Sequence, residues 1–212
     1  MKFFIDTADL DNILENEYII SGVTTNPSLV KKIGKPYHDI LEQIVKKTSL
    51  EHISAEVLSE EEKGMISEGL SLSKISDRIV VKLPMTIAGV KTAKFLISKG
   101  IKVNMTLCFS VTQALIAHNI KANFISPFIG RIDDIVFDGN RLIRDIRTVF
   151  DNYESDTKII SASIRSLNHI AESAISGADI ATIPPKMIKD SIKHILTEKG
   201  LKIFLEDAKN LN

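Results

Sequence analysis

The chain has 212 residues, of which 27 are basic and 27 acidic, so it carries no formal net charge. This balance argues against a nucleic-acid partner, which would need a basic surface to neutralise its phosphates. Apolar residues make up 44% of the chain, with only 10 glycines and 6 prolines, a composition that excludes disordered and fibrous proteins and leaves an ordinary globular chain.

The amino terminus, Met1-Lys2-Phe3-Phe4-Ile5-Asp6, places a charge after only three apolar residues. Because a secretory signal needs a longer apolar region, we expect the protein to stay in the cytoplasm. The longest stretch without a charged residue runs from 103 to 120, but several polar side chains interrupt it. We therefore expect no membrane span and no membrane partner.

Short apolar runs alternate with longer amphipathic segments along the whole chain, without a break in composition. The runs predict eight strands, at residues 2–6, 20–24, 52–57, 79–83, 101–106, 123–126, 158–163 and 179–182. Eight strands separated by helices can close into a single (β/α)8 TIM barrel, so residues 1–212 are expected to form one α/β domain. An open doubly wound sheet is the alternative, but the GxGxxG and P-loop phosphate motifs typical of that fold are absent.

Two segments between the predicted strands carry apolar side chains at helical spacing. The first stripe consists of Leu142, Ile143, Ile146, Val149 and Phe150. The second stripe consists of Leu167, Ile170, Ala171, Ala174 and Ile175. Both segments are predicted to be helices.

Helix boundaries have their own signals. Ser59 followed by Glu62, and Ser110 followed by Gln113, have the spacing of capping boxes, while Gly100 and Gly177 stand where helices should end. Beyond the eighth unit an apolar repeat predicts an extra helix over about 201–211, formed by Leu201, Phe204, Leu205 and Ala208. The barrel does not need this helix, which could cap it or hold a neighbouring subunit.

Nearly every predicted strand ends in polar or ionisable side chains that strand propensity disfavours. They are Asp6, Thr24, Asn26, Glu56, Lys82, Asn104, Thr106, Ser126, Ser161, Ser163 and Arg165. Side chains alternate along a strand, so Asn104 and Thr106 share one face, as do Ser163 and Arg165 if the strand stays extended. A single such residue can be a solvated strand end, but the whole set predicts a site at one mouth of the barrel.

Lys82 is the sharpest case, because Ile79, Val80 and Val81 before it predict a buried central strand. Burial favours the neutral form of an amine, which is the form that attacks a ketone to give a Schiff base. A lysine that is snorkelling, or salt-bridged to Glu56 or Asp6, is the alternative. The same carboxylates would also serve the proton transfers of Schiff-base chemistry.

The remaining candidates divide into anion-binding, nucleophilic and metal-binding groups. Arg131, Ser163 and Arg165 offer donors that suit a phosphate group, although each arginine could be an ordinary surface residue. Cys108 is the only cysteine, and it has no assignable partner, so we expect a small core residue. The five histidines never fall at metal-ligand spacing, so no metal is predicted.

Along its full length the chain resembles the small transaldolase family, which includes the fructose-6-phosphate aldolases. Five motifs carry the resemblance: residues 4–8 (FIDTA), 22–28 (GVTTNPS), 80–84 (VVKLP), 100–106 (GIKVNMT) and 125–134 (ISPFIGRIDD). The resemblance implies a (β/α) barrel and a Schiff-base mechanism on Lys82 without cofactor or metal. It also implies Asp6 as the acid and base of bond cleavage, with Glu56 and Thr106 handling a water molecule.

The resemblance further implies that Asn26, Asn104 and Ser126, beside Thr24, hold substrate hydroxyls and that Arg131, Ser163 and Arg165 receive a phosphate. Glu56 and Phe128 are of the transaldolase type, since the aldolase branch has glutamine and tyrosine there. We therefore expect a transaldolase that moves a dihydroxyacetone unit between sugar phosphates, within a homo-oligomer such as a pentamer or decamer. A fructose-6-phosphate aldolase and a non-catalytic sugar-phosphate-binding barrel are the alternatives.

Overall fold

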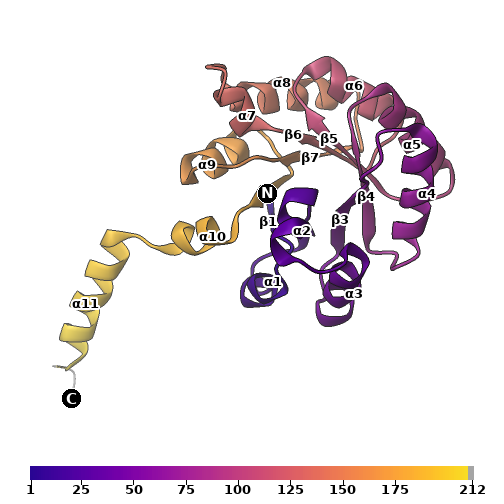
Figure 1. Ribbon diagram of the computed structural model, residues 1–212. Coiled ribbons are helices and arrows are strands. Elements are labelled where there is room, and N and C mark those ends of the chain that lie inside the picture. The colour runs from indigo at the N-terminus through magenta and orange to yellow at the C-terminus, as the bar shows by residue number, and fades with distance from the viewer. Residues whose placement is uncertain (210–212) are drawn as a thin grey trace.

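The computed structural model describes residues 1–209, in which eight parallel strands form a closed barrel in sequence order, from β1 to β8 (Figure 1). Pairing of β1 with β8 closes the barrel. The predicted TIM barrel is confirmed, and the open sheet is excluded. The strands are β1 Lys2–Asp6, β2 Gly22–Thr24, β3 His52–Glu56, β4 Ile79–Pro84, β5 Val103–Cys108, β6 Phe124–Pro127, β7 Lys158–Ser161 and β8 Ile180–Ile183.

Helices connect the strands and cover the outside of the barrel (Figure 1). Those up to β8 are α1 Leu10–Asn16, α2 Pro27–Ile33, α3 Tyr37–Lys47, α4 Glu62–Ser73, α5 Ile87–Ser98, α6 Val111–Asn119, α7 Ile129–Asp133, α8 Gly139–Asn152 and α9 Leu167–Ile175. Two more helices follow β8, namely α10 Pro185–Ile192 and α11 Ile195–Lys209. Strand residues that face these helices, such as Val81 and Leu83, are fully buried in the main hydrophobic core.

Alternate residues of the strands point into the barrel. Near the amino-terminal ends of the strands, a second apolar cluster fills the interior, formed by Phe4, Val80, Phe124, Ile160 and Ile180. Two residues further along β4, β6 and β8, the interior positions are Lys82, Ser126 and Thr182. The barrel therefore has an apolar floor and a polar mouth at the carboxyl ends of its strands, where sites of this fold lie.

Several predicted boundaries differ from the structure for identifiable reasons. The predicted strand at 101–106 begins at Val103 and continues to Cys108 through a β-bulge, with Leu107 at a positive φ of 58°. The predicted capping box of Ser59 and Glu62 is wrong: Glu61 is the N-cap of α4, and the Ser59 hydroxyl bonds to Glu68 instead. Ser110 does cap α6, while Gly100 and Gly177 follow helix ends with positive φ.

Both predicted helical segments are helices in the structure, but their apolar stripes differ in burial. In α8, Ile143, Ile146 and Phe150 are buried as predicted. The helix predicted over the second stripe is also present, as α9, but only Ile170 of that stripe is buried, and Leu167 and Ile175 are 44% and 74% exposed. Helical periodicity identified an apolar face of α9, but the barrel packs against a different face, which includes Ser173.

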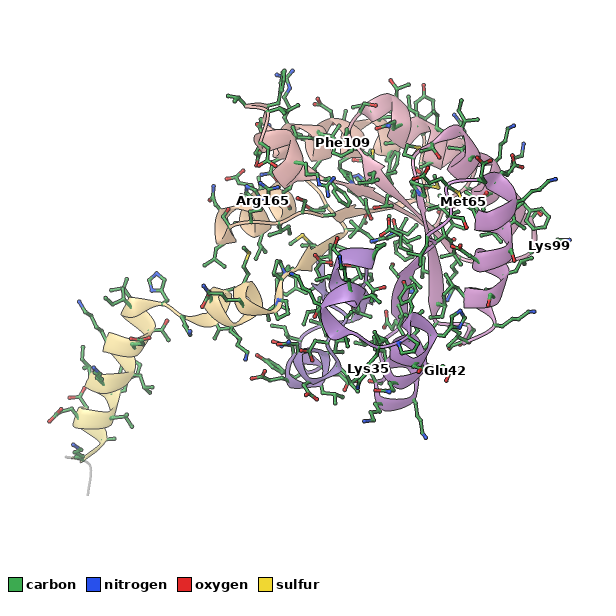
Figure 2. All side chains as sticks on the ribbon, in the orientation of Figure 1. Lys35, Glu42, Met65, Lys99, Phe109 and Arg165 are labelled. Carbon is green, nitrogen blue, oxygen red and sulfur yellow. The ribbon has the colours of Figure 1, made fainter. Side chains whose placement is uncertain are left out.

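Helix α11 extends away from the barrel as an arm joined through α10, and its side chains project with no part of the barrel beside them (Figures 1 and 2). None of its described residues is buried. The predicted extra helix is present but begins six residues earlier than expected, and positions 210 and 211 of the prediction lie outside the described residues. No helix among residues 1–209 is both long and apolar enough to cross a membrane.

Candidate active site

Lys82 lies at the centre of the barrel mouth, on the interior face of β4, and is only 5% exposed. Its Nζ is 3.1 Å from Glu56 Oε2 and donates a hydrogen bond of 2.8 Å to the Thr25 carbonyl oxygen. The pairing register of β3 and β4 sets Glu56 directly beside Lys82. Lys82 is thus buried and lies within ion-pair distance of Glu56, whereas a snorkelling lysine would reach solvent.

Asp6 ends β1 on the same side of the barrel. Burial raises the pKa of the Asp6 carboxyl, although the positive charge of Lys82 and a hydrogen bond from Thr24 oppose the increase. The Thr24 hydroxyl donates to Asp6 Oδ1 at 3.0 Å, so the Thr182 hydroxyl, 2.6 Å from Thr24 Oγ1, must donate to Thr24. A carboxyl whose pKa burial raises suits a group that takes up and returns a proton.

Strands β5 and β6 contribute a second polar group. Asn104, which pairs with Lys82 in the register, is fully buried and accepts a hydrogen bond of 2.8 Å from Ser126. The hydroxyl oxygen of Thr106 is buried and has no hydrogen-bond partner in the structure. Because buried hydroxyl groups nearly always have a partner, Thr106 is positioned to bind a substrate or water molecule.

These side chains surround a cavity of about 160 Å³. Its lining comprises Asp6, Thr24, Asn26, Lys82, Thr106, Ser126, Phe128, Arg131, Ala162, Ser163 and Thr182. Nine of the sequence-predicted site residues therefore line one cavity. Glu56 and Asn104 contact its lining from beside Lys82 and Ser126.

Asn26 lines this cavity and is also the N-cap of α2. Its Oδ1 accepts a hydrogen bond of 3.0 Å from Leu29 N. The side-chain amide Nδ2 therefore remains as the group that can donate to a ligand.

Of the residues predicted to bind a phosphate group, Arg131 and Ser163 line the cavity but Arg165 does not. Arg131 lines the cavity, and its guanidinium carbon lies 5.3 Å from the centre of the Phe128 ring. Arg165, labelled in Figure 2, is instead half-exposed and paired with Asp134, and this hydrogen bonding lowers the pKa of the Asp134 carboxyl. The expected shared strand face of Ser163 and Arg165 is wrong, because β7 ends at Ser161 and Ser163 has a φ of 62°.

Other reactive groups lie outside the cavity. Cys108 is buried, and burial raises the pKa of its thiol to about 12, as expected for a core residue rather than a nucleophile. Within the described part of the chain, no three histidine, cysteine or acidic side chains converge in a way that could hold a metal ion.

Sequence reasoning did not single out Thr182, Thr25 or Tyr37. Thr182 ends the predicted eighth strand and lies one residue before the end of β8, so the rule of polar strand ends applied to that strand would have found it. Thr25 holds Lys82 through its backbone carbonyl, and the phenol of Tyr37 arrives from a helix outside the barrel. No sequence signal marks either of these contacts.

Comparison with known proteins identifies the family of the chain. Residues 3–212 match the family model described as Transaldolase/Fructose-6-phosphate aldolase. Curated relatives named "Probable transaldolase" include one from Hyphomonas neptunium, 51% identical over 211 residues, covering 99% of this chain and 97% of the relative. Another from Chelativorans sp. is 51% identical over 209 residues (98% and 96%), and one from Bartonella quintana is 48% identical over 212 residues (99% and 97%). The chain therefore belongs to the transaldolase/fructose-6-phosphate aldolase family.

Proposed function

We propose that the protein is a transaldolase. It transfers a dihydroxyacetone unit from sedoheptulose 7-phosphate to glyceraldehyde 3-phosphate, giving erythrose 4-phosphate and fructose 6-phosphate. The observation that carries the proposal is the buried amine of Lys82, which lines the same cavity as Asp6 and pairs with Glu56. The names of the relatives and the family resemblance supply the substrates.

Lys82 is the nucleophile of the proposed reaction. Its free amine adds to the ketose C2 carbonyl, and the resulting carbinolamine loses water to form a protonated Schiff base. Asp6 then takes the proton of the C4 hydroxyl while the C3–C4 bond breaks, and the electron pair of that bond forms an enamine on Lys82. The enamine carbon attacks the acceptor aldehyde, and Asp6 returns the proton to the new hydroxyl oxygen.

Glu56 and Thr106 manage the water of this reaction. Glu56 protonates the carbinolamine oxygen so that it leaves as water, and takes a proton back when water hydrolyses the final Schiff base. The unpartnered Thr106 hydroxyl supports this assignment, because it leaves a hydrogen-bonding position free for that water molecule.

The remaining residues bind the sugar chain. Asn104 and Ser126, already joined to each other, receive substrate hydroxyls together with Asn26 Nδ2 and the Thr24 side chain. Arg131 and Ser163 bind the phosphate where they line the cavity. Arg165 joins them by turning its guanidinium from Asp134 toward the phosphate.

Reductive trapping tests the proposal directly. Borohydride added with fructose 6-phosphate should leave a three-carbon adduct on Lys82, identified by peptide mass spectrometry. Lys82→Met should lose adduct and transfer activity by more than about a thousandfold, because no other nucleophile replaces the amine. Lys94→Met, at an exposed lysine, is the matched control and should stay active. Full transfer activity of Lys82→Met would exclude Lys82 as the nucleophile and, with it, the proposed Schiff-base mechanism.

Two alternatives remain to be separated from transfer. A fructose-6-phosphate aldolase would release free dihydroxyacetone without an acceptor aldehyde, whereas a transaldolase keeps the three-carbon unit until an acceptor arrives. A non-catalytic barrel would bind sugar phosphates and form no adduct. Assaying free dihydroxyacetone with and without glyceraldehyde 3-phosphate, beside the trapping experiment, distinguishes all three.

We also propose that the protein is a homo-oligomer, a pentamer or decamer by family resemblance. The support is α11, whose exposed apolar side chains include Leu201, Phe204 and Leu205 at 57%, 72% and 57% exposure. An apolar surface of this kind on an isolated arm favours burial against another copy. The cytoplasmic location expected from the sequence stays a prediction, which cell fractionation would check.

A further inference from the structure

Tyr37 is the first residue of α3, outside the barrel, yet its phenol group reaches the strands behind Lys82. The Tyr37 hydroxyl oxygen lies 2.8 Å from the backbone nitrogen of Glu56 and 2.9 Å from Thr25 Oγ1. Thr25 Oγ1 in turn lies 2.9 Å from the carbonyl oxygen of Ser54. Four residues of α3, β3 and the end of β2 thus form one hydrogen-bonded chain.

The direction of every hydrogen bond in this chain follows from the atoms themselves. The N–H of Glu56 can only donate, so it donates to the Tyr37 hydroxyl oxygen. The Ser54 carbonyl can only accept, so it receives the single hydroxyl proton of Thr25. The phenol proton is then the one left for the remaining contact, so Tyr37 donates to Thr25 Oγ1. The hydrogen bonds therefore all point in one direction, from the Glu56 N–H through Tyr37 and Thr25 to the Ser54 carbonyl, and each proton has one acceptor.

The same two residues that Tyr37 joins also hold the Lys82 amine. Lys82 Nζ donates to the Thr25 carbonyl at 2.8 Å, and it lies 3.1 Å from Glu56 Oε2. The phenol therefore links the backbone of Glu56 to the side chain of Thr25, the two residues between which the amine sits. Burial raises the pKa of Tyr37 to about 12, so its proton is present throughout the working pH range.

Helix α3 keeps the phenol in place. Ile40, Leu41 and Ile44 of this helix are buried in the main core, and they set the height of its first residue relative to the strands. Because α3 is packed in the core and the Tyr37 phenol makes two hydrogen bonds, the phenol is held rigidly against Thr25 and Glu56.

We propose that Tyr37 is a positioning residue, which acts through Thr25 and Glu56 to aim the Lys82 amine at the substrate carbonyl. This inference rests on the proposed Schiff-base function. Tyr37 does not line the cavity of the active site and has no contact with substrate in this role. Removing its hydroxyl leaves the Glu56 N–H without a partner and frees Thr25, so the amine loses its fixed direction.

Tyr37→Phe tests the proposal because it keeps the ring and removes only the hydroxyl. We expect kcat, and the single-turnover rate at which borohydride traps the Lys82 adduct, to fall about 10- to 100-fold, as misplacement of a reacting group does. KM should change by less than about threefold, because the substrate contacts remain. Tyr18→Phe, at a tyrosine that is 72% exposed, is the matched control and should have unchanged rates.

Variants of Thr25 keep the test decisive if Tyr37→Phe folds poorly. Thr25→Ser keeps the hydroxyl and should retain most of the trapping rate, whereas the isosteric Thr25→Val should lose about as much as Tyr37→Phe. The double variant Tyr37→Phe/Thr25→Val should be no slower than either single variant, because each single substitution already removes the same hydrogen bond between Tyr37 and Thr25.

The outcomes separate this inference from the proposed function. If the unaltered protein forms no adduct on Lys82, the proposed function fails. If it forms the adduct, and Tyr37→Phe traps it at the same rate while only its unfolding temperature falls, then Tyr37 is merely structural and the inference is wrong. A Thr25→Ser variant that traps the adduct as slowly as Thr25→Val would also contradict a positioning role for the Thr25 hydroxyl.

Discussion

Asp6 is a carboxyl group for which function and stability are opposed. In the folded protein burial raises its pKa, so the fold holds its proton more tightly than the unfolded chain does. As the pH rises from the ordinary value of 3.8 through the folded-state pKa, ionisation of Asp6 therefore lowers the free energy of unfolding. The cost is fully present once the pH lies above the folded-state pKa.

Asp6→Asn should consequently be more stable than the unaltered protein at pH values above that pKa, while losing bond cleavage. The amide oxygen can still accept from Thr24, and each kcal/mol regained raises the unfolding temperature by about 2–4 °C in a chain of this size. Calorimetry as a function of pH measures this, and the difference should shrink as the pH approaches 3.8. A stability gain that is constant with pH would assign the effect to something other than this ionisation.

Phe128 bears on the choice between transfer and release. Its ring lines the cavity and carries no hydroxyl group with which to position water against the enamine. Phe128→Tyr adds that hydroxyl and should increase the fraction of turnovers that end in free dihydroxyacetone by severalfold. Unchanged partitioning of products between release and transfer would contradict this account of the two family branches.

At the scale of elements, the N-terminus of α2 combines a helix cap with a ligand contact in Asn26. Asn26→Ala should lower the free energy of unfolding by about 1 kcal/mol through the lost cap, and should also weaken substrate binding. Asn26→Asp keeps an oxygen that can accept from Leu29 N but lacks the Nδ2 donor. It should unfold near the original temperature with a raised KM.

Thermal unfolding and steady-state kinetics on the two Asn26 variants separate the two roles. An aspartate variant with an unaltered KM would remove Asn26 from the binding residues. An alanine variant that unfolds at the original temperature would mean that the cap contributes nothing to stability.

The strands and helices also show which features of the fold can be predicted from the sequence. Short apolar runs predicted all eight strands, and polar strand ends predicted most of the cavity lining, because both depend on local chemistry and alternation. The bulge at Leu107 and the turn at Ser163 were missed, since positive φ at residues other than glycine has no reliable sequence signal. Periodicity located α9 correctly, but it does not say which face of a helix the barrel will cover.

For the whole molecule, the arm formed by α11 should decide assembly. Phe204→Ser removes an exposed aromatic ring from the apolar stripe and should reduce the mass measured by light scattering, or make it depend strongly on concentration. Lys202→Ser makes the same replacement at a polar position of the same exposed helix and should leave the mass unchanged. An unaltered protein that is monomeric at micromolar concentration would contradict the homo-oligomer.

The single cysteine has a practical consequence for such experiments. Since Cys108 is buried and its pKa is raised to about 12, maleimide dyes should leave the unaltered protein unlabelled at neutral pH. A cysteine introduced on the arm, as in Ile203→Cys, would then carry the only fluorophore in each chain. Mixing donor- and acceptor-labelled preparations would report subunit exchange in real time, without any need to remove a native thiol first.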